Sequence, residues 1–512
     1  MLFRSLASLA THGVTYTRAS ASKPSDSFPG LTNIVTGGTP KTHGAFYDLA
    51  YDRSLAPPAI DTGNGLLKGT CTPGVFQGTT TEYEEGVDIK QALLNGGAPG
   101  ASLTDGGFPS IDPMKLPRDP AQGCVPVYPW NFIRTNTIFG VIHAAGGRTA
   151  WSDKHPVYAS VSGPTGTALP SNIDDYYSPE INSAVIALPG ITTATGLACS
   201  PVPDGTQLGA WTDSFQNIKC YDTLKVNAVL NEINGKTHDG GQKAKVPTVF
   251  GMNFQAVSVG QKLIEAGVKG GYTDGAGTPT AALLEEIKFV DAAIGQMVDA
   301  LQQRHLLEST LLIITAKHGQ SPIDPQRFFP IPGHSPLHNG TSPANVVAAY
   351  LPFSESPLNP TGIGPTEDDI SLLWLAHATD TLTAVGILET NASVAGIGQL
   401  FYGPGLTTLF NAPGLPPDGD PRTPDIIVQP NMGVVYTGSA KKQEEHGGFA
   451  HDDVNVMLLV SQPGLPANLV TSFVETTQVA PTIVQALGLD PGELDAVRKE
   501  GTPILPGLEF KQ

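Results

Sequence analysis

The sequence carries little charge for its length. Charged residues make up only 15% of the 512 residues, and acidic side chains outnumber basic ones, so the formal net charge is −18. A chain with this balance is a poor partner for a nucleic-acid polymer or an anionic membrane surface. A small phosphate ester stays compatible with it, because a local metal ion or cationic pocket overrides the field of the whole chain.

Long apolar runs are also missing. No stretch of about 18 apolar residues occurs, so the sequence predicts no membrane span. The apolar part of the opening segment MLFRSLASLATHGVTY is short and broken by polar residues, which argues against a signal peptide. Leu2, Leu6, Leu9 and Val14 instead indicate one face of a short helix that leads into a strand. The chain is therefore expected to begin inside a domain.

Cysteine is scarce, and none of the four cysteines belongs to a CxxC pair or a Cys/His cluster. This spacing gives no support to a zinc knuckle. Their even number is compatible with two disulfides, and sequence order favours two local bridges, Cys71–Cys124 and Cys199–Cys220. Four buried free thiols in a cytosolic enzyme are the alternative.

Glycine and proline are abundant, with 58 and 45 residues, and 40% of the chain is hydrophobic. This composition describes a folded globular protein with many turns and long loops. We expect a single α/β domain over residues 1–512, with loop-rich insertions at about 55–130, 157–245 and 325–425.

Apolar periodicity predicts alternating strands and helices. Helices are expected at 136–145, 278–305, 368–378 and 477–487, and strands at 14–17, 149–152, 246–254, 310–315, 425–428 and 454–460. The run TLLIIT at 310–315 is typical of a parallel strand covered on both faces. The alternation predicts a mostly parallel central sheet sandwiched by helices.

The stretch SKPSDSFPGLTNIVTGGTPKTHG, residues 22–44, places Ser27 at a turn just before an apolar helical run. A serine in this position is commonly a helix cap. It also suits a nucleophile, because the positive helix end and its free N–H groups favour a phosphoryl substrate.

Two histidine–glycine pairs lie next to buried strands. Lys317 and His318 follow the strand at 310–315, at the strand end where α/β proteins collect ligands. His446 precedes the strand at 454–460, and Asp452 and Asp453 beside it are better explained as caps than as ligands. Imidazole nitrogens suit zinc, which makes both histidines candidate metal ligands.

Several segments in order resemble the alkaline phosphatase superfamily, and specifically its type I phosphodiesterase/nucleotide pyrophosphatase branch. The resemblance covers nearly the whole chain. It rests on DSFPGLTNIVTGGTPKTHGAFYD, GGRTAWSDKHP, LLIITAKHGQSPID, TPDIIVQP, EEHGGFAHDDVNVMLLV and TTQVAPTIVQALGL.

The resemblance assigns roles to single residues. Ser27 matches the Thr or Ser nucleophile of these enzymes, and His318 and His446 match two of their metal ligands. Asp48 lies near the place of a phosphate-contacting asparagine, and Lys154 follows the strand at 149–152, so both are expected to bind substrate.

The chain also departs from the family pattern. The first core strand, which ends in a ligand Asp, is expected to be missing, because only 26 residues precede Ser27. Lys317 replaces the Asp of the Asp-His-Gly motif, and Val257 and Gln261 stand near the expected Asp-x-x-x-His pair. The Lys317 ammonium can take the place of a metal charge as a catalytic group.

The resemblance implies a hydrolase of small phosphate esters with Ser27 as nucleophile and zinc or another divalent metal as cofactor. The alternative is a catalytically impaired or non-catalytic phosphate-binding relative, because most family ligands are absent. The family implies an extracellular or secretory-pathway protein, and the sequons at Asn339 and Asn391 fit a secreted glycoprotein.

Overall fold

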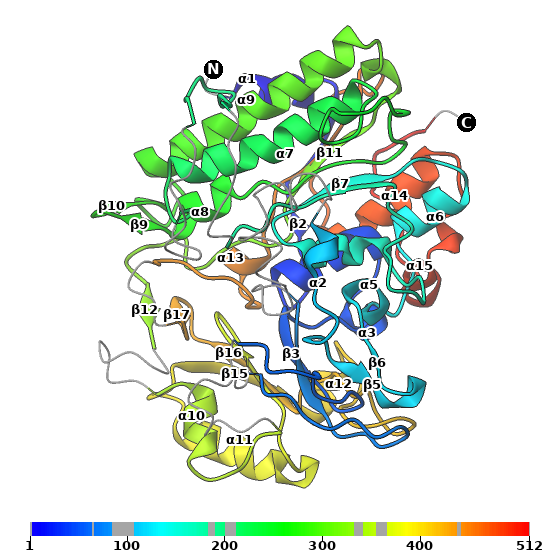
Figure 1. Ribbon diagram of the computed structural model, residues 1–512. Coiled ribbons are helices and arrows are strands. Elements are labelled where there is room, and N and C mark those ends of the chain that lie inside the picture. The colour runs from blue at the N-terminus through cyan, green and yellow to red at the C-terminus, as the bar shows by residue number, and fades with distance from the viewer. Residues whose placement is uncertain are drawn as a thin grey trace.

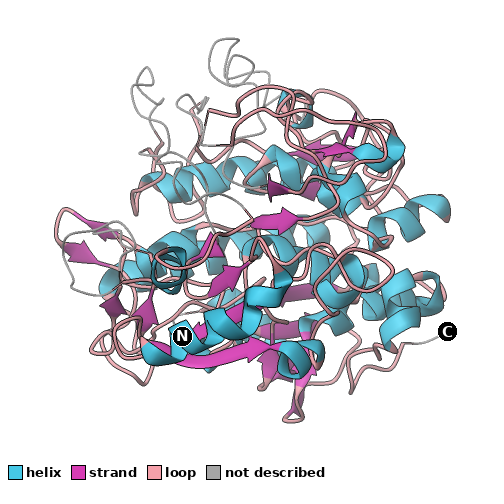
Figure 2. Cartoon of the chain, turned by 90° about the horizontal axis from the view of Figure 1, so that it is seen from below, coloured by secondary structure: helices cyan, strands magenta, loops and turns pink. Residues whose placement is uncertain are grey.

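The computed structural model describes residues 3–63, 66–83, 107–182, 190–199, 211–331, 341–354, 366–437 and 442–510. Helices and short strands lie among long loop segments, in keeping with the abundance of glycine and proline (Figure 2). The two largest sheets of the described residues have four strands each and occupy different parts of the molecule (Figure 1).

The first sheet joins apolar segments that are far apart in the sequence. Its strand order is β11 (Leu312–Thr315), β18 (Leu458–Ser461), β1 (Gly13–Tyr16) and β19 (Asn468–Val470). β18 runs antiparallel to both β11 and β1, whereas β1 and β19 pair in parallel. The α/β character is confirmed, but a mostly parallel central sheet is not. The absence of a preceding core strand stays a prediction.

Helices cover this sheet because each presents an apolar stripe to it. On one side, α9 (Ala281–Gln303) packs against α1 (Arg4–Ala10), α7 (Asn217–Ile233) and α8 (Ala256–Lys262) (Figure 1). Leu9, Ile294 and Leu459 meet there in one buried cluster. The long helix predicted at 278–305 and the short N-terminal helix are both confirmed.

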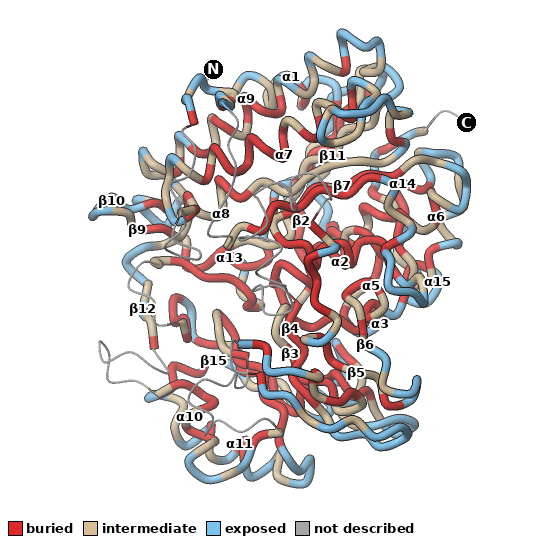
Figure 3. The backbone as a smooth tube through the Cα atoms, in the orientation of Figure 1, coloured by how far each residue is buried: buried red, intermediate tan, exposed pale blue. Residues whose placement is uncertain are grey.

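The opposite part of the core holds the segment that carries Ser27. There α2 (Ser27–Thr36) packs against α14 (Val479–Ala486) and α6 (Ile138–Ala144). Nearly all of α2 is buried, which Figure 3 shows as a continuous red stretch. The helices predicted at 136–145 and 477–487 are confirmed in α6 and α14.

The second sheet is antiparallel throughout. Its order is β13 (Thr366–Glu367), β14 (Ser371–Leu373), β16 (Ile426–Pro430) and β15 (Ile397–Tyr402), and α10 (Pro343–Ala348) and α11 (Thr381–Thr390) lie against it. The predicted strand at 425–428 therefore exists as β16, but it belongs to this sheet and not to the first one.

The helix predicted at 368–378 is wrong, because this segment contains β14. Its side chains alternate between two apolar clusters with the period of a strand. Leu373 and Leu375 pack in one cluster, and Leu372 and Trp374 pack in the other. A strand that is buried on both faces has continuous apolar residues, and this run resembles a buried helix in the sequence.

Two other strand predictions need correction. β11 is an edge strand whose four residues are all half-buried, so it is not covered on both faces. The segment 246–254 forms only isolated parallel bridges, Thr149↔Val249 and Ser152↔Met252, beside β7 (Ala150–Ser152). The strand predicted at 149–152 is confirmed, and that predicted at 454–460 is confirmed in part, because α13 (His451–Val454) precedes β18.

The remaining strands and α-helices of the described chain are smaller. They are the pairs β2 (Ala19–Ser20) with β20 (Val474–Glu475), β3 (Leu49–Asp52) with β4 (Thr79–Glu82), β5 (Arg118–Asp119) with β6 (Val125–Pro126), β7 with β8 (Asp175–Tyr177), β9 (Ile264–Glu265) with β10 (Val268–Lys269) and β12 (Phe329–Pro330) with β17 (Val434–Val435), and the helices α3 (Pro40–His43), α5 (Pro129–Phe132), α12 (Gly403–Thr407) and α15 (Asp495–Glu500). The single domain with three insertions stays a prediction.

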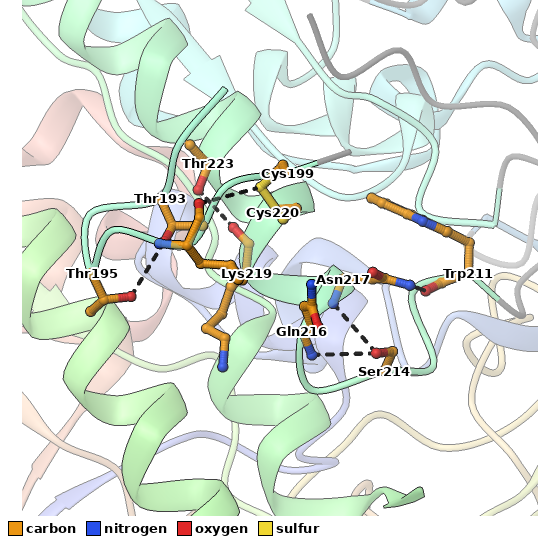
Figure 4. Close-up of a disulfide and its surroundings, with 11 residues drawn as sticks. Thr193, Thr195, Cys199, Trp211, Ser214, Gln216, Asn217, Lys219, Cys220 and Thr223 are labelled. Atoms are coloured by element: carbon orange, nitrogen blue, oxygen red, sulfur yellow. Dashed lines mark hydrogen bonds between the residues drawn. A yellow bond between two sulfur atoms is a disulfide. The ribbon is translucent and has the colours of Figure 1, made fainter. Parts of the chain in front are cut away.

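Both predicted disulfides are present. Cys71 is bonded to Cys124, and Cys199 is bonded to Cys220 on α7, as Figure 4 shows for the second bridge. The alternative of four free thiols is therefore wrong. Among the described residues, every helix is too short or too polar to cross a membrane.

Candidate active site

Ser27 is the first residue of α2, and its neighbour Asp26 is the N-cap. Asp26 Oδ2 accepts hydrogen bonds from the backbone N–H of Phe28 and of Asp48, each at 3.0 Å. The aspartate therefore caps the helix, as short polar side chains commonly do. Ser27 itself has its hydroxyl free to face the strand end at Lys317 and His318.

Gly30 allows α2 to approach that strand end. A Cβ atom at this position lies 2.4 Å from the backbone oxygen of Lys317, which is closer than atoms approach in folded proteins. Only glycine permits this contact, because it has no side chain. The close approach of the helix to the residues after β11 brings Ser27 within reach of His318.

Ser27 Oγ lies 3.0 Å from Nε2 of His318, and Nδ1 of His318 lies 2.7 Å from the carbonyl oxygen of Gly319. A carbonyl only accepts, so Nδ1 carries the proton in the neutral ring. Nε2 is then the acceptor, and the Ser27 hydroxyl donates to it. Burial, with a smaller effect of nearby lysines, lowers the pKa of His318 well below its usual range, which favours this neutral form.

Two lysines border Ser27. The Lys154 ammonium lies 3.5 Å from Ser27 Oγ. Lys317 Nζ is 3.9 Å from Asp153 Oδ1 and lies 4.5 Å from the centre of the Tyr158 ring. Burial lowers the pKa of both lysines, and Lys317 adds to the effect on Lys154. An anionic ligand favours their charged form, so the two ammonium groups suit a phosphate.

Asp48 reaches this region through its backbone. Its N–H donates to Asp26, and its Oδ1 accepts from the N–H of Leu49 at 2.7 Å. These contacts position the aspartate that caps α2. A direct role of the Asp48 side chain in substrate binding stays a prediction.

His446 lies directly beside His318, with the ring centres 4.1 Å apart. Its Nδ1 faces two carboxylates, at 3.7 Å from Asp26 Oδ1 and 3.9 Å from Asp368 Oδ2. Burial, followed by the neighbouring His318 and nearby lysines, lowers the pKa of His446 well below its usual range. A neutral imidazole is the form that binds metals.

Asp368 and Glu445 differ in their charge environment. Burial and the Glu445 charge raise the pKa of Asp368 well above its usual range. Burial acts in the same direction on Glu445, but Lys442 and Lys262 outweigh it and lower the pKa of that carboxyl. Glu445 is ion-paired with Lys442.

The residues present do not fit the two-metal site that the family resemblance implies. Both ring nitrogens of His318 are engaged, one with Ser27 and the other with Gly319. Gln261 bonds to Tyr272 and to Gln320, and it offers an amide where a metal site needs an anion or an imidazole. His446, with Asp368 and Glu445 beside it, is the part of the pocket whose donor atoms suit a cation.

Sequence reasoning missed several residues of this pocket. Asp26 and Glu445 directly precede Ser27 and His446, so adjacency to a predicted site residue was their signal. Asp368 and Tyr158 come from segments without such a neighbour. The capping interpretation holds for Asp453, whose Oδ2 accepts from the N–H of Ala450 at 3.1 Å, at the start of α13.

The fold of the chain is similar to that of solved structures. The chain is similar to murine ectonucleotide pyrophosphatase / phosphodiesterase 5 with a TM-score of 0.51 and 12% identity, over 96% of this chain and 91% of that one. A second structure of the murine protein, an inactive form in complex with AMP, gives a TM-score of 0.51 and 12% identity over 96% and 90%. No curated protein matches the chain.

A family model matches the sequence in two segments, residues 2–84 and 269–452. They contain Ser27, His318 and His446, whereas Lys154 and Gln261 fall in the unmatched part between them. The matched segments together span more than half of the chain, and the fold agrees with them. The chain belongs to the type I phosphodiesterase / nucleotide pyrophosphatase family.

Proposed function

We propose that the chain is a hydrolase of phosphate esters that uses Ser27 as its nucleophile. The observation that carries the proposal is the 3.0 Å contact between Ser27 Oγ and His318 Nε2 at the first residue of α2. Family membership supports phosphate esters as the substrate class. A diester or nucleotide-like substrate is favoured over a monoester, and the AMP in the similar murine structure fits the nucleotide-like part of this choice.

The reaction begins with the Ser27 hydroxyl. As Oγ attacks phosphorus, its proton passes to His318 Nε2, while the Gly319 carbonyl holds the proton on the other ring nitrogen. The bond between phosphorus and the leaving oxygen breaks, and the imidazolium returns the proton to that oxygen. Water then attacks the phosphoserine, and Ser27 leaves with a proton.

The negative charge on the phosphoryl oxygens in the transition state has partners in the pocket. Lys154 lies 3.5 Å from Ser27 Oγ, and the N-terminal end of α2 adds a positive partial charge. Lys317 contributes a second ammonium from the end of β11. His446, Asp368 and Glu445 are the residues that would hold a divalent metal, and such an ion would supply Lewis-acid polarisation of a phosphoryl oxygen.

We further propose that the protein acts in the secretory pathway or outside the cell. The two disulfides support this, because such bonds persist in oxidising compartments. The sequon residue Asn391 lies at the end of α11, where it is half-buried. Asn339 lies outside the described residues.

Hydrolysis of bis(4-nitrophenyl) phosphate tests the function. The wild type is expected to release nitrophenol, Ser27→Ala to lose at least about a thousandfold in kcat, and Ser27→Thr to keep measurable turnover because it retains a hydroxyl. Ser309→Ala is the control, because this exposed hydroxyl bonds only to Leu306 O within the described chain. Equal rates for the wild type and Ser27→Ala would sink the nucleophile assignment.

The second candidate is a phosphate-binding protein without turnover. The two lysines beside Ser27 favour it, because they attract an anion whether or not chemistry follows. Saturable binding of AMP by the wild type, with no nitrophenol or phosphate released over hours, would select this candidate over the hydrolase.

A further inference from the structure

A buried group of donor atoms faces His446. One carboxylate oxygen of Asp368, one of Glu445 and one nitrogen of His446 all lie within 4.8 Å of one another. A third carboxylate joins them, because Asp26 Oδ1 is 3.7 Å from His446 Nδ1. The atoms come from the start of α2, from the edge of the second sheet and from the loop before α13.

Three side-chain atoms of these four residues are buried without a hydrogen-bond partner among the described residues. They are Asp26 Oδ1, Glu445 Oε2 and His446 Nδ1. The three residues are exposed by only 0%, 1% and 9%. Buried polar atoms nearly always have a partner, so three unpaired ones in the same small space require an explanation such as a bound ion.

The other oxygens of the carboxylates are engaged in a way that fixes each side chain. Asp26 Oδ2 accepts from two backbone N–H groups, and Glu445 Oε1 is paired with Lys442. Asp368 Oδ1 accepts from the Thr437 hydroxyl, while its Oδ2, which also receives the Tyr47 hydroxyl at 3.3 Å, faces His446. Metal ligands are commonly held by such outer contacts.

The spacing and the donor chemistry suit a single cation. Atoms that ligate one ion at about 2.0–2.2 Å lie roughly 3–4.5 Å apart, and the separations of 3.7 and 3.9 Å from His446 Nδ1 fall in this range. Carboxylate oxygens with one imidazole suit zinc or manganese. The carboxylates also offset the charge of a dication.

We propose that Asp26, Asp368, Glu445 and His446 form a binding site for one divalent transition-metal ion. Two of these residues, Asp368 and Glu445, stand outside the ligand pattern that the family resemblance implies. The single ion lies on the His446 side of the pocket, while Lys317 and Lys154 supply positive charge on the Ser27 side. The proposed site can be tested by metal binding alone, and the proposal does not depend on turnover of a substrate.

Calorimetric titration of the metal-stripped full chain with Zn²⁺ alone tests the site. We expect one equivalent per chain, and at least a tenfold weaker affinity in Glu445→Gln and in Asp368→Asn. Glu444→Gln is the matched control, because this neighbouring buried glutamate lies outside the group around His446. His318→Ala is expected to keep the single equivalent.

Thermal unfolding provides a second readout. Zn²⁺ is expected to raise the Tm of the wild type and of Glu444→Gln, and to raise that of Glu445→Gln much less. Each variant is first shown to unfold cooperatively without metal, and Asp368→Asn replaces Glu445→Gln if the latter does not fold. No binding, two equivalents, loss of the ion in His318→Ala, or equal effects of Glu444→Gln and Glu445→Gln would each overturn the proposal. Hydrolysis is not measured, so a failure here is separate from a failure of the proposed function.

Discussion

The two halves of the pocket differ in charge although they touch. The Ser27 half contains Lys154 and Lys317 around His318, whereas the His446 half contains three carboxylates. The two histidine rings lie 4.1 Å apart at the boundary. Burial lowers the pKa of both imidazoles well below the usual range, so neither burial nor protonation state distinguishes them.

What distinguishes the histidines is their hydrogen bonding. Both ring nitrogens of His318 have partners, and one of these is the Ser27 hydroxyl. Nδ1 of His446 has none among the described residues and faces carboxylates. Two histidines that look alike in sequence are thus suited to different tasks, one to moving a proton and the other to holding a cation.

Replacing each of the two histidines by alanine in turn is the strongest test of this difference. We expect His318→Ala to lower kcat by about 10²–10⁴, the range of general acid–base catalysis, while one equivalent of Zn²⁺ still binds. His446→Ala is expected to lose the ion. Turnover of the diester and zinc stoichiometry are measured on the same preparations.

Two results would contradict this assignment of the histidines. If His318→Ala loses the metal and His446→Ala keeps it, the assignment of the two halves is reversed. If both variants lose metal and activity together, the pocket is one functional unit and the comparison between its halves fails.

Removing the Lys317 ammonium from the Ser27 half is expected to have the next largest effect. Lys317→Met is expected to lower kcat/KM by about 10–100-fold, the value of a hydrogen bond to a charged group. Its stability is expected to change little, because the Asp153 carboxylate keeps three donors: the Trp151 indole, the Lys154 backbone and the Asn253 amide. Lys288→Met, at an exposed ion pair on α9, is the control.

A change in kcat/KM equal to that of Lys288→Met would show that the Lys317 ammonium does not act on the substrate. Unfolding in urea separates this result from a loss of structure. A large loss of stability in Lys317→Met would assign the lysine to packing against the Tyr158 ring.

Local chemistry made much of the fold predictable. The apolar stripe of α9 and the apolar run after Ser27 are encoded within short windows, and both form helices, although Ser27 is the first residue of α2 and not part of a turn before it. The disulfides followed from the order of four isolated cysteines. Strand direction and sheet membership depend on distant partners, and so the place of β16 in a second, antiparallel sheet was not predictable.

The residues of the candidate site also divide into those that a local motif reveals and those that only the fold brings together. Ser27, His318 and His446 carry motifs that can be recognised one by one, whereas Asp368, which follows the two-residue strand β13, has no motif of its own. Its place beside His446 results from the packing of the second sheet against the loop before α13, where Asp369 donates its N–H to the His446 carbonyl at 3.2 Å. Such contacts between distant segments leave no local pattern in the sequence.

A buried carboxyl group behind the Ser27 half gives the prediction with the smallest expected effect, which is on stability and its dependence on pH. Burial raises the pKa of Glu180 to about 8, against the opposing effects of the Asn182 N–H and the Lys154 charge. Glu180 lies 2.7 Å from His155 Nδ1, and the carbonyl of Lys154 accepts from the next backbone N–H after Glu180, that of Ile181. A neutral Glu180 adds no negative charge to this half, where Asp153 is the carboxylate beside Lys317.

Because the folded chain holds this proton more tightly than the unfolded chain, stability is complete below about pH 4.5 and decreases as the pH rises toward 8. The slope contributed by one group is about 1.4 kcal/mol per pH unit at most. Glu180→Gln stays neutral at every pH, so the difference in unfolding free energy between wild type and variant should shift in favour of the variant between pH 5 and 8. Urea unfolding at several pH values measures it, and a difference that stays constant over this range would mean that Glu180 is ionised in the folded chain and neutralises part of the Lys154 charge.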